Sequence, residues 1–269
     1  MKNPKMGLND VQEYWRDHGR RELGHVGDSP KKRDEFLQRL IEDEIIKWLR
    51  PGMRLLDIGC GDGTSTLRFA EITGSAVGID YAKERVEKAI NNAKEKNSRK
   101  VKFVEGDVLD LVDIEKSHGN FDIIVMIRCL INLPSCDMQE KAIDNVTNIL
   151  KNNGLFLISE GWQEGFDSVS SYRQSMGLEQ LRLVEHNLYI KKTFLENKIR
   201  DRYSILDYKN FGFYLFMSRV FQPALVLPEQ PAHDHRVNET AYDLCTRLIG
   251  SNDFVDCDFA GLYALQKNG

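Results

Sequence analysis

The spacing of hydrophobic residues divides the chain into three parts. Over residues 8–49, apolar side chains recur three or four positions apart, which predicts helices that end at Pro51-Gly52. From Met53 onward, short apolar runs alternate with amphipathic stretches. The runs predict strands over residues 54–58, 76–79, 101–105, 121–127 and 155–159, and the stretches predict helices over 64–73, 83–96 and 138–151. Because the fourth run has almost no polar alternation, we expect a parallel sheet with helices on both faces.

After residue 160 the pattern is less regular, and residues 160–189 are expected to form a loop and a short helix. Farther on, the pattern predicts helices over 191–200, 212–226 and 239–248, and strands over 203–208 and 259–266. The stretch 212–226 is apolar on all sides, so we expect other parts of the chain to cover it.

Composition narrows the classes of function. The chain has 269 residues and a net charge of −4, and no basic stripe dominates, so we expect no nucleic-acid partner. Apolar runs are strand-sized and the first ten residues lack the apolar core of a signal peptide, which predicts a cytoplasmic protein without a membrane partner. His233 and His235 lie two positions apart, but no third ligand is spaced to join them, so no metal site is predicted.

The most informative segment follows the first predicted strand. Asp57 is followed by Gly59, Gly61 and Gly63, and a predicted helix begins at Thr64. Glycines there allow a ligand to approach the backbone, and the amides at a helix start favour an anionic group. A dinucleotide-binding loop has the spacing G-x-G-x-x-G, whereas this loop has G-x-G-x-G.

This segment resembles motif I, D-x-G-x-G-x-G, of the class I S-adenosylmethionine-dependent methyltransferases. Asp80 ends the second strand, about twenty residues beyond the loop, where a carboxylate can bind ribose hydroxyls. Gly106-Asp107-Val108 ends the third strand and is similar to the family's segment beside the adenine. The resemblance implies S-adenosylmethionine as the cofactor. The positions that it assigns to cofactor binding are Asp57, Gly59, Gly61, Gly63, Asp80, Tyr81, Asp107, Val108 and Arg128.

The same resemblance implies the fold class. We expect an α/β, Rossmann-like, doubly wound sheet that is mostly parallel and has seven strands, the final one antiparallel. Residues 1–50 are expected to form an N-terminal helical cap and residues 51–160 the cofactor-binding core. Residues 161–269 are then a substrate-binding elaboration that also completes the sheet.

The acceptor is expected at the carboxyl ends of the strands, because ligands of open α/β sheets bind there. His186 is our candidate for the general base, since a neutral imidazole can take a proton from a hydroxyl, and His18 and His25 are its rivals. The residues expected to bind the substrate by stacking or ionic contact are Trp15, Trp162, Arg173, Tyr189 and Arg219.

The acceptor class is a weaker inference. Short stretches around residues 186–189 and 214–220 are similar to methyltransferases of sugar and surface-polysaccharide biosynthesis, which implies a small-molecule acceptor with a sugar or nucleotide-linked hydroxyl. Residues 128–132 carry no carboxylate, unlike the metal-dependent catechol-type enzymes, so metal-independent transfer is expected. Methylation of an amine or a carboxylate, a nicotinamide-dependent oxidoreductase and a cofactor-binding protein without catalysis all stay open, as does the oligomeric state.

Overall fold

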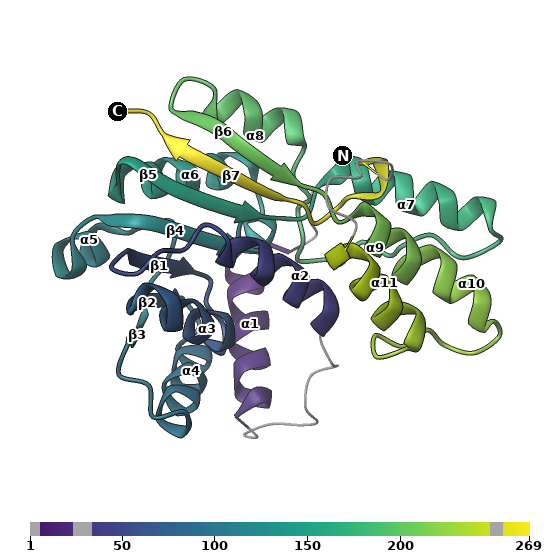
Figure 1. Cartoon of the computed structure of the whole chain (residues 1–269), viewed down its shortest axis with the longest axis horizontal. Helices are drawn as coiled ribbons and strands as arrows, with labels where there is room; N and C mark the ends of the chain where they lie inside the picture. The colour runs from purple at the N-terminus through teal and green to yellow at the C-terminus, as the bar shows by residue number, and fades with distance from the viewer. Residues whose placement is uncertain (1–5, 24–33, 248–254) are drawn as a thin grey trace.

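The computed structural model describes residues 6–23, 34–247 and 255–269, which form one seven-stranded sheet with helices on both faces (Figure 1). The strands are β1 Arg54–Ile58, β2 Ser75–Asp80, β3 Val101–Glu105, β4 Phe121–Ile127, β5 Leu150–Ser159, β6 Tyr203–Lys209 and β7 Leu262–Lys267. The α-helices are α1 Leu8–Glu22, α2 Glu35–Ile46, α3 Thr64–Thr73, α4 Lys83–Glu95, α5 Val112–His118, α6 Cys136–Ile149, α7 Gln163–Ser175, α8 Lys192–Ile199, α9 Gly212–Phe216, α10 Gln222–Val226 and α11 Arg236–Arg247.

The strand order is β3-β2-β1-β4-β5-β7-β6. The first five strands pair in parallel, and β7 runs antiparallel to both β5 and β6. The chain leaves β1 toward β2 and β3 and then returns to the other side of β1 as β4, so the winding reverses between β1 and β4. In doubly wound sheets the ligand crevice opens at this reversal. The predicted fold class is confirmed.

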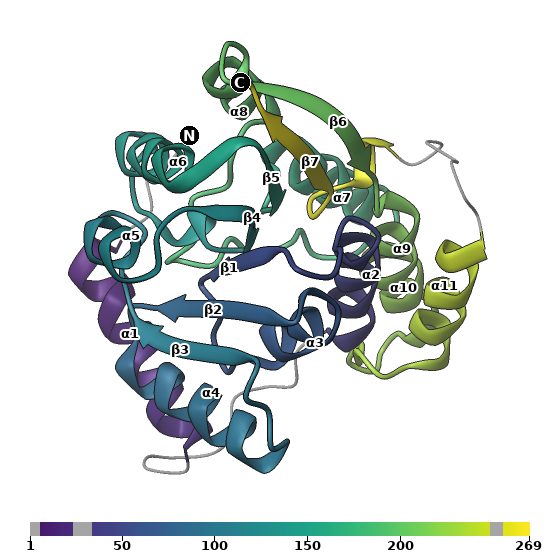
Figure 2. The same cartoon turned by 60° about the vertical axis from the view of Figure 1, so that its left-hand side comes forward.

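Helices cover the sheet (Figure 2), and two apolar layers pack between the helices and its faces. One layer packs α5, α6 and α8 against the sheet through side chains such as Ile114, Ile143 and Leu195. The other layer uses α2, α3, α9 and α11, with Ile41, Phe69 and other buried side chains. Two-sided burial explains the near-continuous apolar sequence of β4.

Several predicted boundaries shift. β5 begins at Leu150, because the chain enters the sheet directly at the end of α6, and α5 was not predicted at all. The long helix expected over 212–226 contains a π-helical turn at Met217–Phe221, between α9 and α10. In the part expected to form a loop and a short helix, α7 is a 13-residue helix. The division into parts at residues 50 and 160 stays a prediction.

Within the described ranges, every helix is either too short or too polar to cross a lipid bilayer. The cytoplasmic location also stays a prediction.

Candidate active site

A cavity of about 260 Å³ opens at the carboxyl ends of the parallel strands, beside the β1–β4 reversal. Its floor consists of strand ends and the residues after them, including Asp57, Asp80, Asp107 and Arg128. Helix α1 covers it with Trp15 and other side chains. The sequence predicted the floor of this cavity, because each strand end follows directly from the apolar pattern.

The glycine loop brings bare backbone to the cavity. Gly59, Gly61 and Gly63 have φ of +76°, +58° and +76°, in the left-handed region that side chains with a Cβ rarely adopt. At Gly61 a Cβ would lie 2.5 Å from Nη2 of Arg85, and at Gly63 it would overlap the ring of Phe103. The conformation therefore favours glycine at all three positions, and packing against Phe103 also excludes a side chain at Gly63, which does not itself line the cavity.

Two buried carboxylates face the cavity from β1 and β2. Oδ2 of Asp57 accepts a hydrogen bond from Oγ1 of Thr66 at 2.5 Å. Burial raises the pKa of Asp57 to about 7 against the effect of that hydrogen bond, and the charges of Glu42 and Asp80 raise it further. Asp80 accepts from the backbone N–H of Gly61 (3.0 Å) and of Ala82 (2.9 Å). Two buried carboxyl groups close together favour a ligand that is cationic or donates hydrogen bonds.

Arg85 supplies a positive charge near Asp80. Its side chain is buried, and its guanidinium lies over the ring of Trp15, with Cζ 5.0 Å from the ring centroid. Its Nε lies 3.5 Å from Oε2 of Glu22. Burial raises the pKa of Asp80, and the charge of Arg85 opposes that shift. Arg85 could not be recognised from the sequence, because these contacts come from α1, 63 or more positions earlier.

Helix α1 is attached to the rest of the molecule at both sides of the cavity. The hydroxyl of Tyr81 donates to the carbonyl of Val11 at 3.1 Å, and Nε1 of Trp15 donates to Oδ1 of Asn132 at 3.1 Å. At Gly19 the helix approaches α4 so closely that a Cβ would lie 2.9 Å from Cβ of Glu84. The covering position of α1 is therefore built into its packing against α4.

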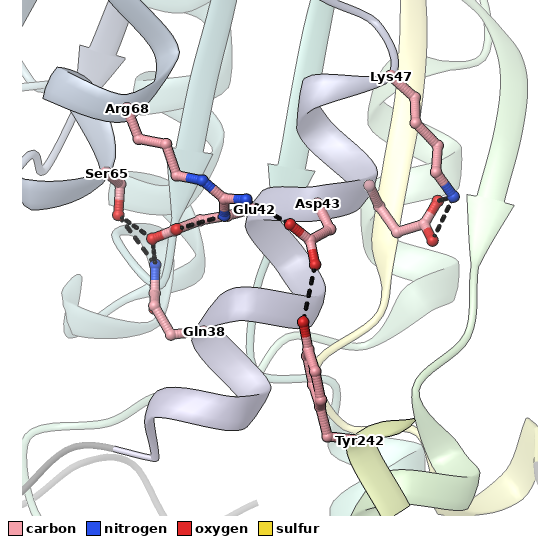
Figure 3. Close-up of polar contacts among 8 residues, drawn as sticks. Gln38, Glu42, Asp43, Lys47, Ser65, Arg68 and Tyr242 are labelled. Carbon is pink, nitrogen blue, oxygen red and sulfur yellow. Dashed lines mark hydrogen bonds and ion pairs between the residues drawn. The ribbon is translucent and has the colours of Figure 1, made fainter. Parts of the chain in front are cut away.

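A polar network joins the cavity wall to helix α11 (Figure 3). Oε1 of Glu42 accepts from Nε2 of Gln38 (3.1 Å) and from Oγ of Ser65 (2.6 Å), two side chains that line the cavity. Oε2 of Glu42 accepts from Arg68, whose guanidinium also pairs with Asp43. Asp43 in turn accepts from the hydroxyl of Tyr242 on α11, at 3.2 Å. The network fixes α2 between α3 and α11.

The predicted substrate residues divide into two groups. Trp15 and the rival base His18 line the cavity. His186 lies behind them: its ring centroid is 4.1 Å from that of Tyr14 and 5.5 Å from that of Trp15, and it is 7% exposed. Burial lowers the pKa of His186 to about 4, and the charges of Arg128 and His18 act in the same direction. His25 lies outside the described residues.

The other group does not reach the cavity lining. Trp162 is fully buried, and its Nε1 donates to the carbonyl of Gly261 at 2.8 Å. Tyr189 packs against Phe166, with 4.5 Å between ring centroids. Arg219 forms an ion pair with Asp34 at the start of α2.

Arg173 donates to the carbonyl of Arg219 inside the π-helical turn. Trp162, Arg173 and Arg219 therefore make contacts with other parts of the chain and lie outside the lining of the cavity. The two histidines considered as metal ligands lie near residue 233. Of these, His233 approaches a carboxylate, with its Nδ1 3.9 Å from Oδ2 of Asp34. Over the described ranges, no three His, Cys, Asp or Glu side chains gather as a metal site would need.

Comparison with known sequences adds a family. A family whose description reads methyltransferase domain matches residues 49–210. A curated relative, the ribosomal protein L11 methyltransferase of Thermosipho melanesiensis, is 34% identical over 141 residues, which cover 52% of this chain and 46% of that relative. The chain spans less than half the length of the first curated relatives that it matches.

Solved structures agree in fold. An S-adenosylmethionine-dependent methyltransferase from Anabaena variabilis superposes with a TM-score of 0.66 at 17% identity, covering 100% of this chain and 98% of that one. The magnesium protoporphyrin IX methyltransferase of Synechocystis, solved with bound S-adenosylhomocysteine, gives a TM-score of 0.62 at 14% identity, covering 96% and 98%. At sequence identities this low, the two comparisons show a shared fold only.

Proposed function

The chain belongs to the methyltransferase-domain family, and from that membership we propose that it transfers a methyl group from S-adenosylmethionine to a hydroxyl of a small molecule. The predicted membership of the class I S-adenosylmethionine-dependent methyltransferases, and the cofactor that goes with it, are confirmed. The observation that carries the proposal is the cavity itself, in which the glycine loop and the carboxylates of Asp57, Asp80 and Asp107 meet under α1.

The residues present fit the cofactor. Gly59 and Gly61 line the cavity without side chains, so the backbone of the loop can approach the amino-acid end of the cofactor there. Asp57 places a buried carboxylate beside that end, where an ammonium group would compensate its burial. Asp80 is the residue to bind the ribose hydroxyls, and Asp107 with Val108 would flank the adenine. When bound, the cofactor supplies an electrophilic methyl group on a sulfonium.

We assign the general base to His18 rather than to His186. His18 lines the cavity, and its Nδ1 lies 3.6 Å from Oε1 of Glu22, four residues along the same helix. A carboxylate at that position favours a proton on Nδ1, which leaves Nε2 to accept the proton of the acceptor hydroxyl. His186 lies behind Tyr14 and Trp15, and its low pKa makes it a weak base. His186 then supports the aromatic cover instead.

The acceptor is assigned from the cavity's own groups. The amides of Gln12 and Asn132 line it, and such side chains bind hydroxyl groups by donating and accepting hydrogen bonds. A sugar or nucleotide-linked hydroxyl could form hydrogen bonds with these side chains. This is the same acceptor class that the short sequence similarities imply. The two named relatives act on a ribosomal protein and on a porphyrin, so the comparisons do not choose the acceptor.

The test begins with calorimetry. We expect the wild-type protein to bind S-adenosylhomocysteine and to give no heat with NAD⁺; the reverse result would favour an oxidoreductase and overturn the proposal. Release of S-adenosylhomocysteine in the presence of nucleotide sugars, amines and carboxylic acids then identifies the acceptor, and activity only on amines or acids would overturn the hydroxyl assignment.

Two matched variants test the base. We expect His18→Gln to lower turnover by about a hundredfold or more, the range of general-base catalysis, with affinity for S-adenosylhomocysteine nearly unchanged. His186→Gln should lower turnover much less. The opposite ranking would return the role of base to His186.

A further inference from the structure

Glu160 is a buried acid that neither the motif nor the proposed mechanism uses. It directly follows β5, and its side chain has no exposed surface. Its carboxylate accepts hydrogen bonds from three consecutive backbone N–H groups: Oε1 from Cys129 and Leu130, both at 2.8 Å, and Oε2 from Ile131 at 3.1 Å. One side chain thus satisfies three consecutive backbone donors of the turn after β4.

That turn builds one side of the cavity. Arg128 has φ of +53°, an uncommon conformation for a residue with a side chain, and its N–H donates to the carbonyl of Ser159 at 2.8 Å. Cβ of Cys129 lies so near the glycine loop that a Cβ on Gly59 would be 3.2 Å from it. Nδ2 of Asn132 donates back to the carbonyl of Arg128 at 2.7 Å. All three residues line the cavity.

The bond set requires a carboxylate. Three donors need an acceptor at both ends of the side chain, and an amide accepts at only one of its two terminal atoms. The cost of burying the acid is visible in its pKa, which burial raises to about 7 although the three N–H groups and the charge of Arg128 lower it. Because burying the Glu160 carboxyl is unfavourable, we expect this side chain to have a role beyond closing the turn after β4.

We propose that Glu160 is a positioning residue for the cofactor site: by holding residues 129–131 from behind, it fixes Arg128, Cys129 and Asn132 where they line the cavity. The role rests on the proposed function, because it assumes that the cavity holds the cofactor. Glu160 does not line the cavity itself and acts through the turn.

The experiment compares two buried carboxylates. Glu160→Gln removes one of the acceptors of the turn, and Asp258→Asn is its matched control. Asp258 is also fully buried, and accepts from the hydroxyl of Tyr208 (2.6 Å) and the N–H of Ala260 (3.2 Å), but does not line the cavity. Calorimetry with S-adenosylhomocysteine and thermal unfolding are measured on the full chain of each variant.

We expect both variants to lower the melting temperature, and only Glu160→Gln to weaken S-adenosylhomocysteine binding, by about tenfold. Such a split would not arise from loss of stability alone. If Glu160→Gln does not fold, Glu160→Asp replaces it, since the shorter acid keeps the charge but not the reach to all three N–H groups, and weaker binding is again expected.

Binding by the Glu160 variants within twofold of the wild type, or an equal loss in Asp258→Asn, would overturn the positioning role while leaving the proposed function intact. Failure of the wild type to bind S-adenosylhomocysteine would instead overturn the proposed function, and this inference with it.

Discussion

Trp15 and Asn132, 117 positions apart in the sequence, are joined by a hydrogen bond of 3.1 Å from Nε1 of the indole to Oδ1 of the amide. The bond connects the cover of the cavity to the turn after β4, which Glu160 holds from the other side. The guanidinium of Arg85 lies over the ring of the same tryptophan. Trp15 is therefore where the cover, the turn and α4 meet.

Trp15→Phe should weaken S-adenosylhomocysteine binding by roughly three- to tenfold, since it keeps an aromatic ring but removes a hydrogen bond of about 0.5–1.5 kcal/mol. Calorimetry measures the change. Trp48→Phe is the control. Trp48 packs in the apolar layer that contains α2, and it does not line the cavity. Equal loss in both variants would mean that Trp15 acts only through general stability.

Asp80→Asn should weaken S-adenosylhomocysteine binding by roughly ten- to a hundredfold, because hydrogen bonds to an ionised group contribute about 1.5–3 kcal/mol. The circular dichroism spectrum should stay that of the wild type. Asp113→Asn is the control: Asp113 is an exposed acid on α5, and the variant should bind as the wild type does. Unchanged affinity in Asp80→Asn would contradict the assignment of the ribose site.

Two glycines at opposite ends of α3 separate backbone strain from packing. Gly63 and Gly74 have φ of +76° and +82°, but a Cβ would overlap Phe103 at Gly63 and meets no atom within 4 Å at Gly74. Gly74→Ala should cost about 1–2 kcal/mol of unfolding free energy from strain alone. Gly63→Ala should cost about 1–3 kcal/mol more from overpacking. Urea unfolding of both variants measures the difference. Equal losses of unfolding free energy would show that the side chains around Phe103 shift to make room for the added methyl group.

The buried imidazole of His186 predicts a dependence of stability on pH. Its pKa is about 4 in the folded protein and 6.5 in the unfolded chain, because burial and the nearby charges of Arg128 and His18 disfavour the proton. Between these values the unfolded chain binds more protons, so the stabilising contribution is complete above pH 6.5 and is lost as the pH falls toward 4.

His186→Phe keeps a ring against Tyr14 but cannot be protonated. Relative to this variant, the wild type should lose up to about 1.4 kcal/mol of unfolding free energy per pH unit below 6.5. The two proteins should differ by a constant amount above pH 7. Parallel curves from pH 8 to 5 would show that His186 is protonated as easily in the folded protein as in the unfolded chain.

Local pattern was enough for the core of the fold. The predicted helix over residues 64–73 matches α3, and the strands over 54–58, 101–105 and 121–127 match β1, β3 and β4. The expected glycine loop lies at the cavity, as do Asp57, Asp80 and Asp107. These residues could be found because each follows a strand directly in the chain, and the sheet then brings the strand ends to one edge.

Trp15, a substrate residue expected from the sequence, does line the cavity, but most of the other contacts around it could not be found in this way. Tyr189 and Trp162 carried aromatic signals typical of binding residues, but the half-buried Tyr189 packs against Phe166 and Trp162 is fully buried against the sheet. Glu160 and Arg85 carried no signal, because a charged residue beside a strand or on a helix is ordinary in sequence and gains its partners only in space.

The sequence by itself determined the order of strands and helices, the glycine loop and the family, since hydrophobic period and turn chemistry act over a few neighbouring residues. Tertiary structure alone decided which histidine meets the cavity, how α1 covers it, and that Glu160 holds the turn after β4. Those outcomes depend on contacts between residues about 30 to 120 positions apart, such as Glu160 with Cys129 and Trp15 with Asn132, whose pairing is set by the packing of whole elements and not by any local pattern.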